Sequence, residues 1–600
     1  MITVRKPLAS DDTLIRSTYL GSLASLIFAA AAILIGQLVD GIVIGKFLGT
    51  ECVAAFGLVG PLYLLVSAVG GITSAGASTY CGRLIGMNRL KDANKAYTTN
   101  IVVTVLFCVI SSAVVLAFAG GFVNLLGAEK GSALYTPAIR YVYGLAPSFL
   151  FMSLLTMFMS MFYLDGGKKL VLIGIVISTT VNILGDLLNV FVFKGGMLGM
   201  SLATTASYVV GFFVLLLHFK GEHMLKLVWE DFSFRPMKEI VRFGLPKAAN
   251  KCCNFLRSFV LNRILILIAT ATAIAALSVR TNLSNFFAAI STGIGHATVL
   301  LGAIYAGEQD KDSLRKTFAV SLKYGFLIAA AISLIVFIFA RPLVSICSSD
   351  PEVMDMAVVS LRWYMASFPL YTVVIVFLNM YQSIGRTGRT SVVCALDEFA
   401  LVSVCALVFG FAFGVSGIWA AFFFGEVLML VIIFLWTWKY CGHFPRTLED
   451  FMLLPSDFDF SDRERYSARV HTETDAVQIS EEIRQLLLRN RVNEKNANMM
   501  ALCVEELTVN IVRWGFRKGS KREVAEVYLV NRKGEWLLRI RDNCGAFNPE
   551  KWYNLHQCAS DYEKIGIRMV FGMASDIQYT NTLQLNNLLI KIPESESLGE

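Results

Sequence analysis

The sequence contains few charged residues for its length. Asp, Glu, Lys and Arg make up 16% of the 600 residues, whereas 55% are hydrophobic. So little charge cannot give one domain of this size a polar surface, which excludes a wholly soluble protein. The net charge of +8 comes mostly from basic residues in short loops, so we expect no nucleic-acid partner.

The sequence also lacks paired or metal-spaced cysteines. Its twelve cysteines are scattered, and only Cys252 and Cys253 are adjacent. This distribution predicts reduced thiols rather than a disulfide framework or a cysteine metal centre. A cleavable signal peptide is not expected either, because the first apolar run is too long and ends without a small-residue cleavage pattern.

An internal repeat is the main positive feature. The segment MFYLDGGKK around Tyr163 returns as MYQSIGRTG around Tyr381, and GMLGMSLA around Gly199 returns as FGVSGIWAA around Gly417. The offset is 218 residues in both cases. Two copies of a membrane unit of roughly 220 residues are therefore predicted, an arrangement that places substrate and ion sites between pseudo-symmetric halves.

Apolar stretches of about 20 residues, long enough to cross a bilayer, define the expected topology. Twelve can be placed, six per repeat, near 18–44, 54–80, 98–120, 137–163, 169–193, 198–219, 244–269, 273–303, 318–340, 360–384, 391–413 and 415–438. Lys and Arg gather in alternate loops, for example at Arg89, Lys91, Lys168 and Arg386. This bias predicts a multi-pass protein of the plasma (inner) membrane with both termini in the cytoplasm.

Four regions follow from the repeat and from the loss of apolar character after about residue 453. We expect an N-terminal six-helix lobe at 1–220, a second six-helix lobe at 221–445, a linker at 446–460 and a soluble cytosolic domain at 461–600. The fold class is therefore an α-helical membrane protein with an appended α+β domain.

Several membrane segments together resemble the multidrug and toxic compound extrusion (MATE) family. They lie at 38–72, 181–191, 196–208 and 243–256, and the resemblance extends over about 12–440. It implies two six-helix bundles, alternating access, and export of small organic compounds driven by H⁺ or Na⁺ as the coupling ion.

Carboxylates within the first lobe indicate an ion path, because a charge inside a membrane helix is costly unless it is paired, hydrated or protonated. Asp40 lies in the first span, and Asn182 and Asp186, four residues apart, share one face of the fifth. The family's cation site resembles this set, which Thr204 completes. The alternative is that Asp40 ends its helix near water and Asn182 bonds a neighbouring carbonyl.

The second lobe departs from this pattern, since Cys405 stands where the repeat would place a partner for Asp186. We therefore expect ion binding in the first lobe. The second lobe instead carries a set of charged residues, Lys251, Arg257, Arg263, Arg280, Asp397, Glu398 and Glu426. They form either a structural ion-pair network or a cavity for an anionic or zwitterionic substrate.

The last 140 or so residues alternate between helical and strand periodicity. Amphipathic helices are predicted at 480–490 and 497–516, and strands at 523–532, 535–543 and 586–593. These helices and strands predict an α+β layer large enough to have its own core.

Motifs in this region resemble the GHKL ATP-binding domain of anti-sigma-factor serine kinases. In VEELTVNIVRWG, Glu506 would polarise water and Asn510 would ligate Mg²⁺; in IRDNCGAFNP, Asp542 would accept the adenine amino group. Gly545 and Gly566 match the glycine positions of the later boxes. The resemblance implies that Mg-ATP or Mg-ADP binds this domain.

Two departures weaken a catalytic role for the domain. Cys544 replaces the glycine of Asp-x-Gly, and Arg568 replaces the second glycine of Gly-x-Gly. A bulky residue hinders the approach of phosphate to backbone N–H groups, although Arg568 could contact phosphate itself. We therefore expect nucleotide or partner sensing rather than phosphotransfer.

Three functions remain open from the sequence. The first is an ion-coupled exporter of small molecules whose cytosolic domain senses nucleotide or a regulatory protein. The second is a membrane signalling protein in which the helical part detects a ligand and the domain controls a cytosolic regulator. The third is a lipid-linked sugar flippase, which would suit the cationic second lobe.

Overall fold

The computed structural model describes residues 13–126, 128–221, 223–229, 232–268, 271–347, 350–455, 458, 465–516, 523–532, 535–549, 551, 553, 570–571, 576–583 and 585–593. The chain divides into two compact units. The helical unit is Tyr19–Leu454, and the other unit combines Pro455–Glu600 with the residues up to Thr18.

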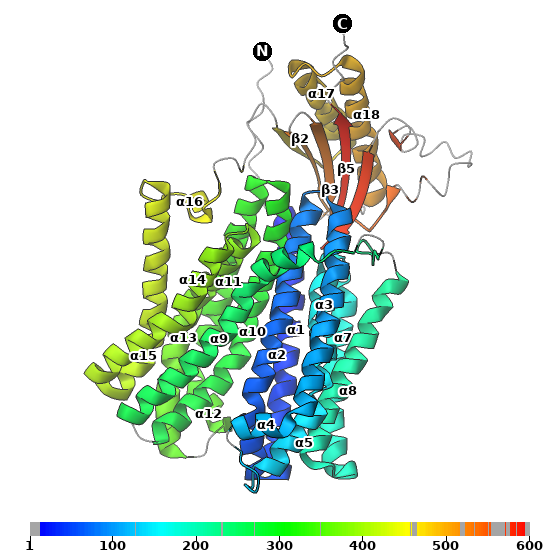
Figure 1. Cartoon of the computed structure of the whole chain (residues 1–600). Helices are drawn as coiled ribbons and strands as arrows, with labels where there is room; N and C mark the ends of the chain where they lie inside the picture. Colours follow the sequence, from blue (N-terminus) through cyan, green and yellow to red (C-terminus); the bar gives the residue numbers. More distant parts are fainter. Residues whose placement is uncertain are drawn as a thin grey trace. The chain divides into compact units, whose positions relative to one another are not determined.

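The first half of the helical unit is built from long helices joined by short loops (Figure 1). In chain order they are α1 Thr13–Val43 with η1 Ile44–Leu48, α2 Thr50–Gly86, α3 Leu90–Ala117, α4 Ala119–Leu125, α5 Tyr135–Leu145, α6 Ser148–Leu164, α7 Lys168–Leu188 with η2 Asn189–Phe193, and α8 Gly196–Leu216 with η3 Leu217–Lys220. Helices α5 and α6 meet at a bend of 49°.

The second half repeats this layout. Its helices are α9 Arg235–Ile268, α10 Ala271–Glu308, α11 Lys311–Ile338, α12 Ala340–Cys347, α13 Pro351–Ser383, α14 Thr387–Ala395 with η4 Leu396–Ala400, α15 Leu401–Cys441 and α16 Leu448–Met452. Helix α15 is broken at Gly414, where φ is 63° and ψ is −146°.

The helical unit has the length and surface of a membrane protein. Among the described residues, eight helices are long and apolar enough to span a bilayer, or nine if the bent pair α5 and α6 forms one span. Large apolar side chains such as Phe118, Phe193 and Phe411 are more than three-fifths exposed, as suits contact with lipid. The predicted count of twelve spans is therefore supported only in part, and one 55-residue segment, Thr387–Cys441, covers two predicted spans.

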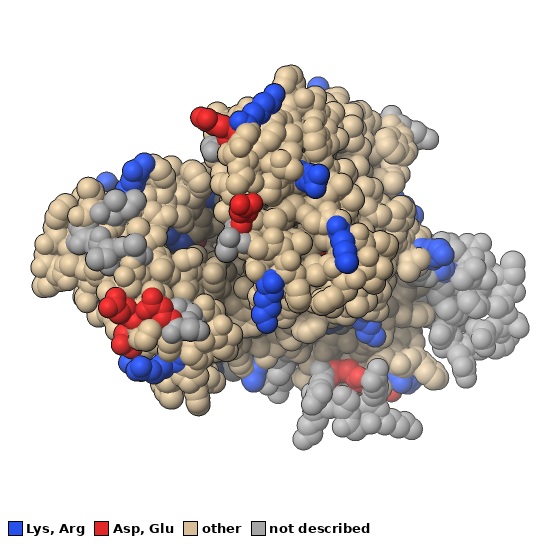
Figure 2. Space-filling model, turned by 90° about the horizontal axis from the view of Figure 1, so that it is seen from below, with Lys and Arg blue, Asp and Glu red and all other residues tan. Residues whose placement is uncertain are grey.

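The two halves approach most closely along α2, which packs against α9 and α10. A Cβ atom added to Gly76 would lie 2.1 Å from the Ile240 carbonyl oxygen, and one added to Gly86 would lie 2.1 Å from that of Ile304. Only glycine permits this backbone contact. The seam lies at the end of the unit where the basic loops gather, and Figure 2, which views the opposite face, shows a hollow between the two helix groups.

The second unit contains a five-stranded antiparallel sheet with strand order β1-β2-β3-β5-β4. Its strands are β1 Arg465–Val470, β2 Ala525–Arg532, β3 Glu535–Asp542, β4 Asp576–Thr582 and β5 Leu585–Pro593, and its helices are α17 Glu473–Arg489, α18 Glu494–Asn510 and η5 Ile511–Gly515. The apolar faces of both helices and the sheet form one buried core around Trp536. The three strands predicted from the sequence are confirmed, and β1 and β4 were not predicted.

Candidate functional site

Four polar residues predicted from the sequence come together within the first half. Asp40 on α1, Asn182 and Asp186 on α7, and Thr204 on α8 are all buried. The Asn182 amide donates to the Thr204 hydroxyl at 3.5 Å. The Asp40 carboxyl lies within hydrogen-bonding reach of both Asp186 and Asn182. The structure thus places two carboxyl groups against each other, with an amide and a hydroxyl beside them.

These two carboxyl groups have too few donors. Among the described residues, neither oxygen of Asp186 and only one oxygen of Asp40 has a hydrogen-bond partner. Two unit charges about 4 Å apart would repel by about 4 kcal/mol even at an effective dielectric constant of about 20. The pair is therefore stable only with a shared proton or a bound cation.

Aromatic and amide side chains that the sequence did not single out surround this pair. The Gln37 amide donates to the Tyr63 hydroxyl at 3.1 Å, and the hydroxyls of Tyr63 and Tyr208 lie 3.2 Å apart. Tyr141 also lies within electrostatic range of both carboxyl groups. Spacing could have indicated two of these residues, since Gln37 is one turn before Asp40 and Tyr208 one turn after Thr204.

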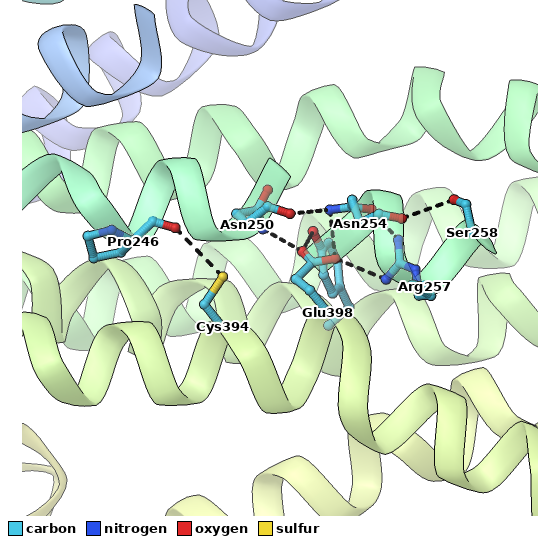
Figure 3. A network of polar contacts seen from close by, with 8 residues as sticks. Pro246, Asn250, Asn254, Arg257, Ser258, Cys394 and Glu398 are labelled. Atoms are coloured by element: carbon cyan, nitrogen blue, oxygen red, sulfur yellow. Dashed lines mark hydrogen bonds and ion pairs between the residues drawn. The ribbon is translucent and has the colours of Figure 1, made fainter. Parts of the chain in front are cut away.

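In the second half, Glu398 is the centre of a complete hydrogen-bond network (Figure 3). Its two oxygens accept from Asn250 at 2.8 Å, Asn254 at 2.9 Å and Arg257 at 2.9 Å, all on α9. The Tyr371 hydroxyl on α13 donates to the same carboxylate at 3.2 Å. Arg257 is thus neutralised by Glu398, which joins α9 to η4.

Two other predicted carboxyl groups form a pair of their own. Asp397 on η4 and Glu426 on α15 are buried and lie within hydrogen-bonding reach of each other. Both oxygens of Asp397 and one of Glu426 lack a donor among the described residues. Shifted by the repeat offset of 218 residues, Glu426 corresponds to Tyr208. The second half therefore also holds a carboxyl pair, which the comparison of Asp186 with Cys405 did not reveal.

The remaining predicted cations do not join these networks. Arg280 is 5% exposed and stacks on aromatic rings, with its guanidinium 4.2 Å from the Phe422 centroid and 5.3 Å from that of Tyr364. Arg263 is exposed and lies over Phe259. Lys251 on α9 is half-buried.

The nucleotide residues predicted in the second unit lie near the end of β3. The Asp542 carboxylate accepts from the Asn586 amide at 2.8 Å and from the Cys544 N–H at 2.9 Å, both through Oδ1. Burial raises the pKa of Asp542 above its ordinary value, against the opposing effect of these hydrogen bonds. The carboxylate is therefore held in a fixed direction at the edge of the core.

The predicted Mg²⁺ side lies on α18. The Asn510 amide donates back to the Glu506 carbonyl at 2.7 Å. At the end of η5, a Cβ atom on Gly515 would lie 3.1 Å from the Cys544 sulfur, so the helical box adjoins the loop after β3 that also contains Gly545. Gly566 and Arg568 lie outside the described residues.

Comparisons with known proteins match the helical part of the chain. The family model MatE matches residues 17–188 and 246–407. Multidrug export protein MepA of Staphylococcus saprophyticus subsp. saprophyticus is 25% identical over 379 residues, which cover 62% of this chain and 82% of that protein.

Solved structures share the fold. A MATE crystal structure in complex with MaD3S aligns with a TM-score of 0.67 at 20% identity, covering 70% of this chain and 95% of the other. A structure described by reverse polarity of its binding pocket, from a MOP superfamily transporter of Pyrococcus furiosus Vc1 (DSM3638), aligns with a TM-score of 0.66 at 18% identity, covering 72% and 97%. The predicted helical membrane fold is thereby confirmed.

Proposed function

Because the chain belongs to the MatE family of multidrug efflux transporters and is not an enzyme, we propose that it exports small organic compounds in exchange for H⁺ or Na⁺ through the Asp40–Asp186 pair. The observation that carries this proposal is the pair's missing donors. A buried carboxyl pair that needs one positive charge is suited to take up a proton or cation on one side of the membrane and release it on the other.

The seam along α2 supports an alternating-access cycle. Closed backbone contact at one end and a hollow at the other correspond to a state open to the side opposite the basic loops. Binding of the coupling ion to Asp40 and Asp186 would favour one arrangement of α1 against α7 and α8, because it removes the repulsion between the carboxylates.

Replacement of either carboxylate by its amide tests the proposal. Asp40→Asn and Asp186→Asn keep the shape and remove the titratable charge, so each should abolish ion-coupled flux while the protein still inserts and folds. The matched control is Asp92→Asn, an exposed carboxylate in the same half. Normal flux in both site variants would reject the assignment.

Twelve spans and an inner-membrane location with cytoplasmic termini are part of the proposal. Splitting Thr387–Cys441 at Gly414 and counting α5 with α6 as one span raises the eight apolar helices to ten. Helices α2 and α9, of 37 and 34 residues, complete twelve. Each is long enough to cross a bilayer, at about 1.5 Å rise per residue.

A second substrate class is favoured by Arg280. The Glu398 network supports a structural role for Arg257, but Arg280 has no carboxylate partner among the described residues. A cation held between two aromatic rings would recognise an anionic or zwitterionic compound, including the lipid-linked sugar of a flippase. Arg280→Gln should then change substrate selectivity without loss of thermal stability, whereas loss of stability would leave Arg280 as a structural residue.

For the second unit we propose a GHKL-like sensor of Mg-ATP or Mg-ADP that regulates transport. The fixed direction of the Asp542 carboxylate supports adenine recognition, and Glu506 and Asn510 supply the Mg²⁺ side. Full-length protein should gain thermal stability with Mg-ADP, lose that response in Asp542→Ala, and show negligible ATPase activity. A stabilising cytosolic protein without any nucleotide response would instead support the signalling alternative.

A further inference from the structure

A chain reversal directly after α15 brings three metal-ligating side chains together. Helix α15 ends at Cys441, Gly442 adopts a left-handed conformation with φ of 73°, and the chain turns back into α16. One ligand atom each from Cys441, His443 and Asp450 lies within 4.8 Å of the other two. Among the described residues this is the one such group of three or more.

The ligand atoms are already oriented by neighbouring backbone groups. His443 Nδ1 lies 3.2 Å from the Phe444 carbonyl oxygen, a contact that requires Nδ1 to carry the proton. Nε2 is then the acceptor, and it lies 4.0 Å from Asp450 Oδ1. The other Asp450 oxygen accepts from the N–H groups of Arg446 and Thr447, both at 2.9 Å. This is the arrangement of a metal-binding histidine, whose second nitrogen is fixed by a carbonyl.

The backbone around this group is anchored within the helical unit. Arg386 donates to the Tyr440 hydroxyl at 2.9 Å and to the Leu453 carbonyl at 3.1 Å. Lys311 pairs with Glu449 at 2.8 Å, and Met452 is fully buried. The three ligands therefore project from a fixed turn, while His443 stays exposed, so an ion can reach it.

We propose that Cys441, His443 and Asp450 form a binding site for a divalent transition-metal ion of the Zn²⁺ class. Thiolate, imidazole and carboxylate are the ligands that Zn²⁺ uses, with a fourth position left to water or another group. Neighbouring ligands of a tetrahedral Zn²⁺ are roughly 3.5 Å apart, so closure by about 1 Å suffices. Binding would displace the thiol proton and tie the end of α15 to α16, just before the chain continues at Pro455.

Cobalt binding by the full-length, tag-free protein in detergent tests this site. Metal-stripped wild type titrated with Co²⁺ should develop the thiolate-to-cobalt charge-transfer absorption, saturating at one equivalent. Cys441→Ser should lose this absorption, and His443→Gln should weaken Co²⁺ binding by at least about tenfold. Zn²⁺ should displace the bound Co²⁺ and raise the unfolding temperature of the wild type but not of these variants.

Matched controls separate the site from other thiols and imidazoles. Cys347→Ser replaces an exposed free cysteine and His471→Gln an exposed histidine, and both should retain the full cobalt spectrum. His443 is exposed, so His443→Gln should unfold at the wild-type temperature without metal and serves if Cys441→Ser folds poorly. Identical cobalt spectra in wild type and His443→Gln, or no thiolate absorption in saturated wild type, would overturn the proposal.

Discussion

The seam along α2 predicts that alanine at Gly76 or Gly86 shifts the transporter away from its observed state. The added methyl would lie 2.1 Å from a backbone carbonyl oxygen, whereas real Cβ contacts are essentially never under 3.0 Å. The helices must separate by about 1 Å, because a backbone oxygen cannot rotate away. Overpacking of this kind typically costs about 1–3 kcal/mol, which is roughly a 5- to 150-fold change in population.

The matched control lies on the same helix. A methyl added at Gly57 would have no atom within 4 Å, so Gly57→Ala should gain the helical preference of alanine, at most about 1 kcal/mol, without any clash. Spin labels at positions 91 and 312 report the distance across the seam. This distance should increase in Gly76→Ala and Gly86→Ala and stay unchanged in Gly57→Ala. Equal distances in all three variants would refute the close-packed seam.

Three further predictions concern the buried carboxyl groups. Glu398→Gln leaves Arg257 without its counter-charge and should cost about 3–5 kcal/mol, seen as a lower melting temperature in detergent that exposed Glu352→Gln does not share. Asp397→Asn gives Glu426 a donor, so its melting temperature should equal or exceed that of the wild type; a fall like that of Glu398→Gln would contradict a shared proton. Because the folded-state pKa of Asp542 is raised, the stability of the second unit should fall as pH rises through that pKa. Asp542→Asn should flatten this dependence in thermal unfolding, and an unchanged pH profile would show that Asp542 does not titrate there.

Much of the helical unit was predictable because its signals are local. Long apolar runs and the repeat of 218 residues indicate membrane helices in two copies, and spacing along one helix placed Asn182 beside Asp186. The span count was harder, since helix α15 continues through Gly414 without a polar loop.

Contacts between distant helices were not predictable from one sequence. Nothing in the spacing places Glu426 against Asp397 or Tyr63 against Tyr208, because each pair forms only when the helices pack. The same holds for Cys441, His443 and Asp450, whose mixed ligand types and irregular spacing resemble no cysteine motif. In the second unit, β1 and β4 lacked a strong alternation of apolar residues, and their strand state depends on pairing with β2 and β5.

The most direct test of the central claim is uphill substrate flux in proteoliposomes under an imposed H⁺ or Na⁺ gradient, without ATP. We predict substrate movement against its own gradient that stops when an ionophore collapses the coupling gradient and that is absent in Asp40→Asn and Asp186→Asn. Flux that persists after collapse of both gradients, or that requires ATP, would contradict an ion-coupled exporter built on this carboxyl pair.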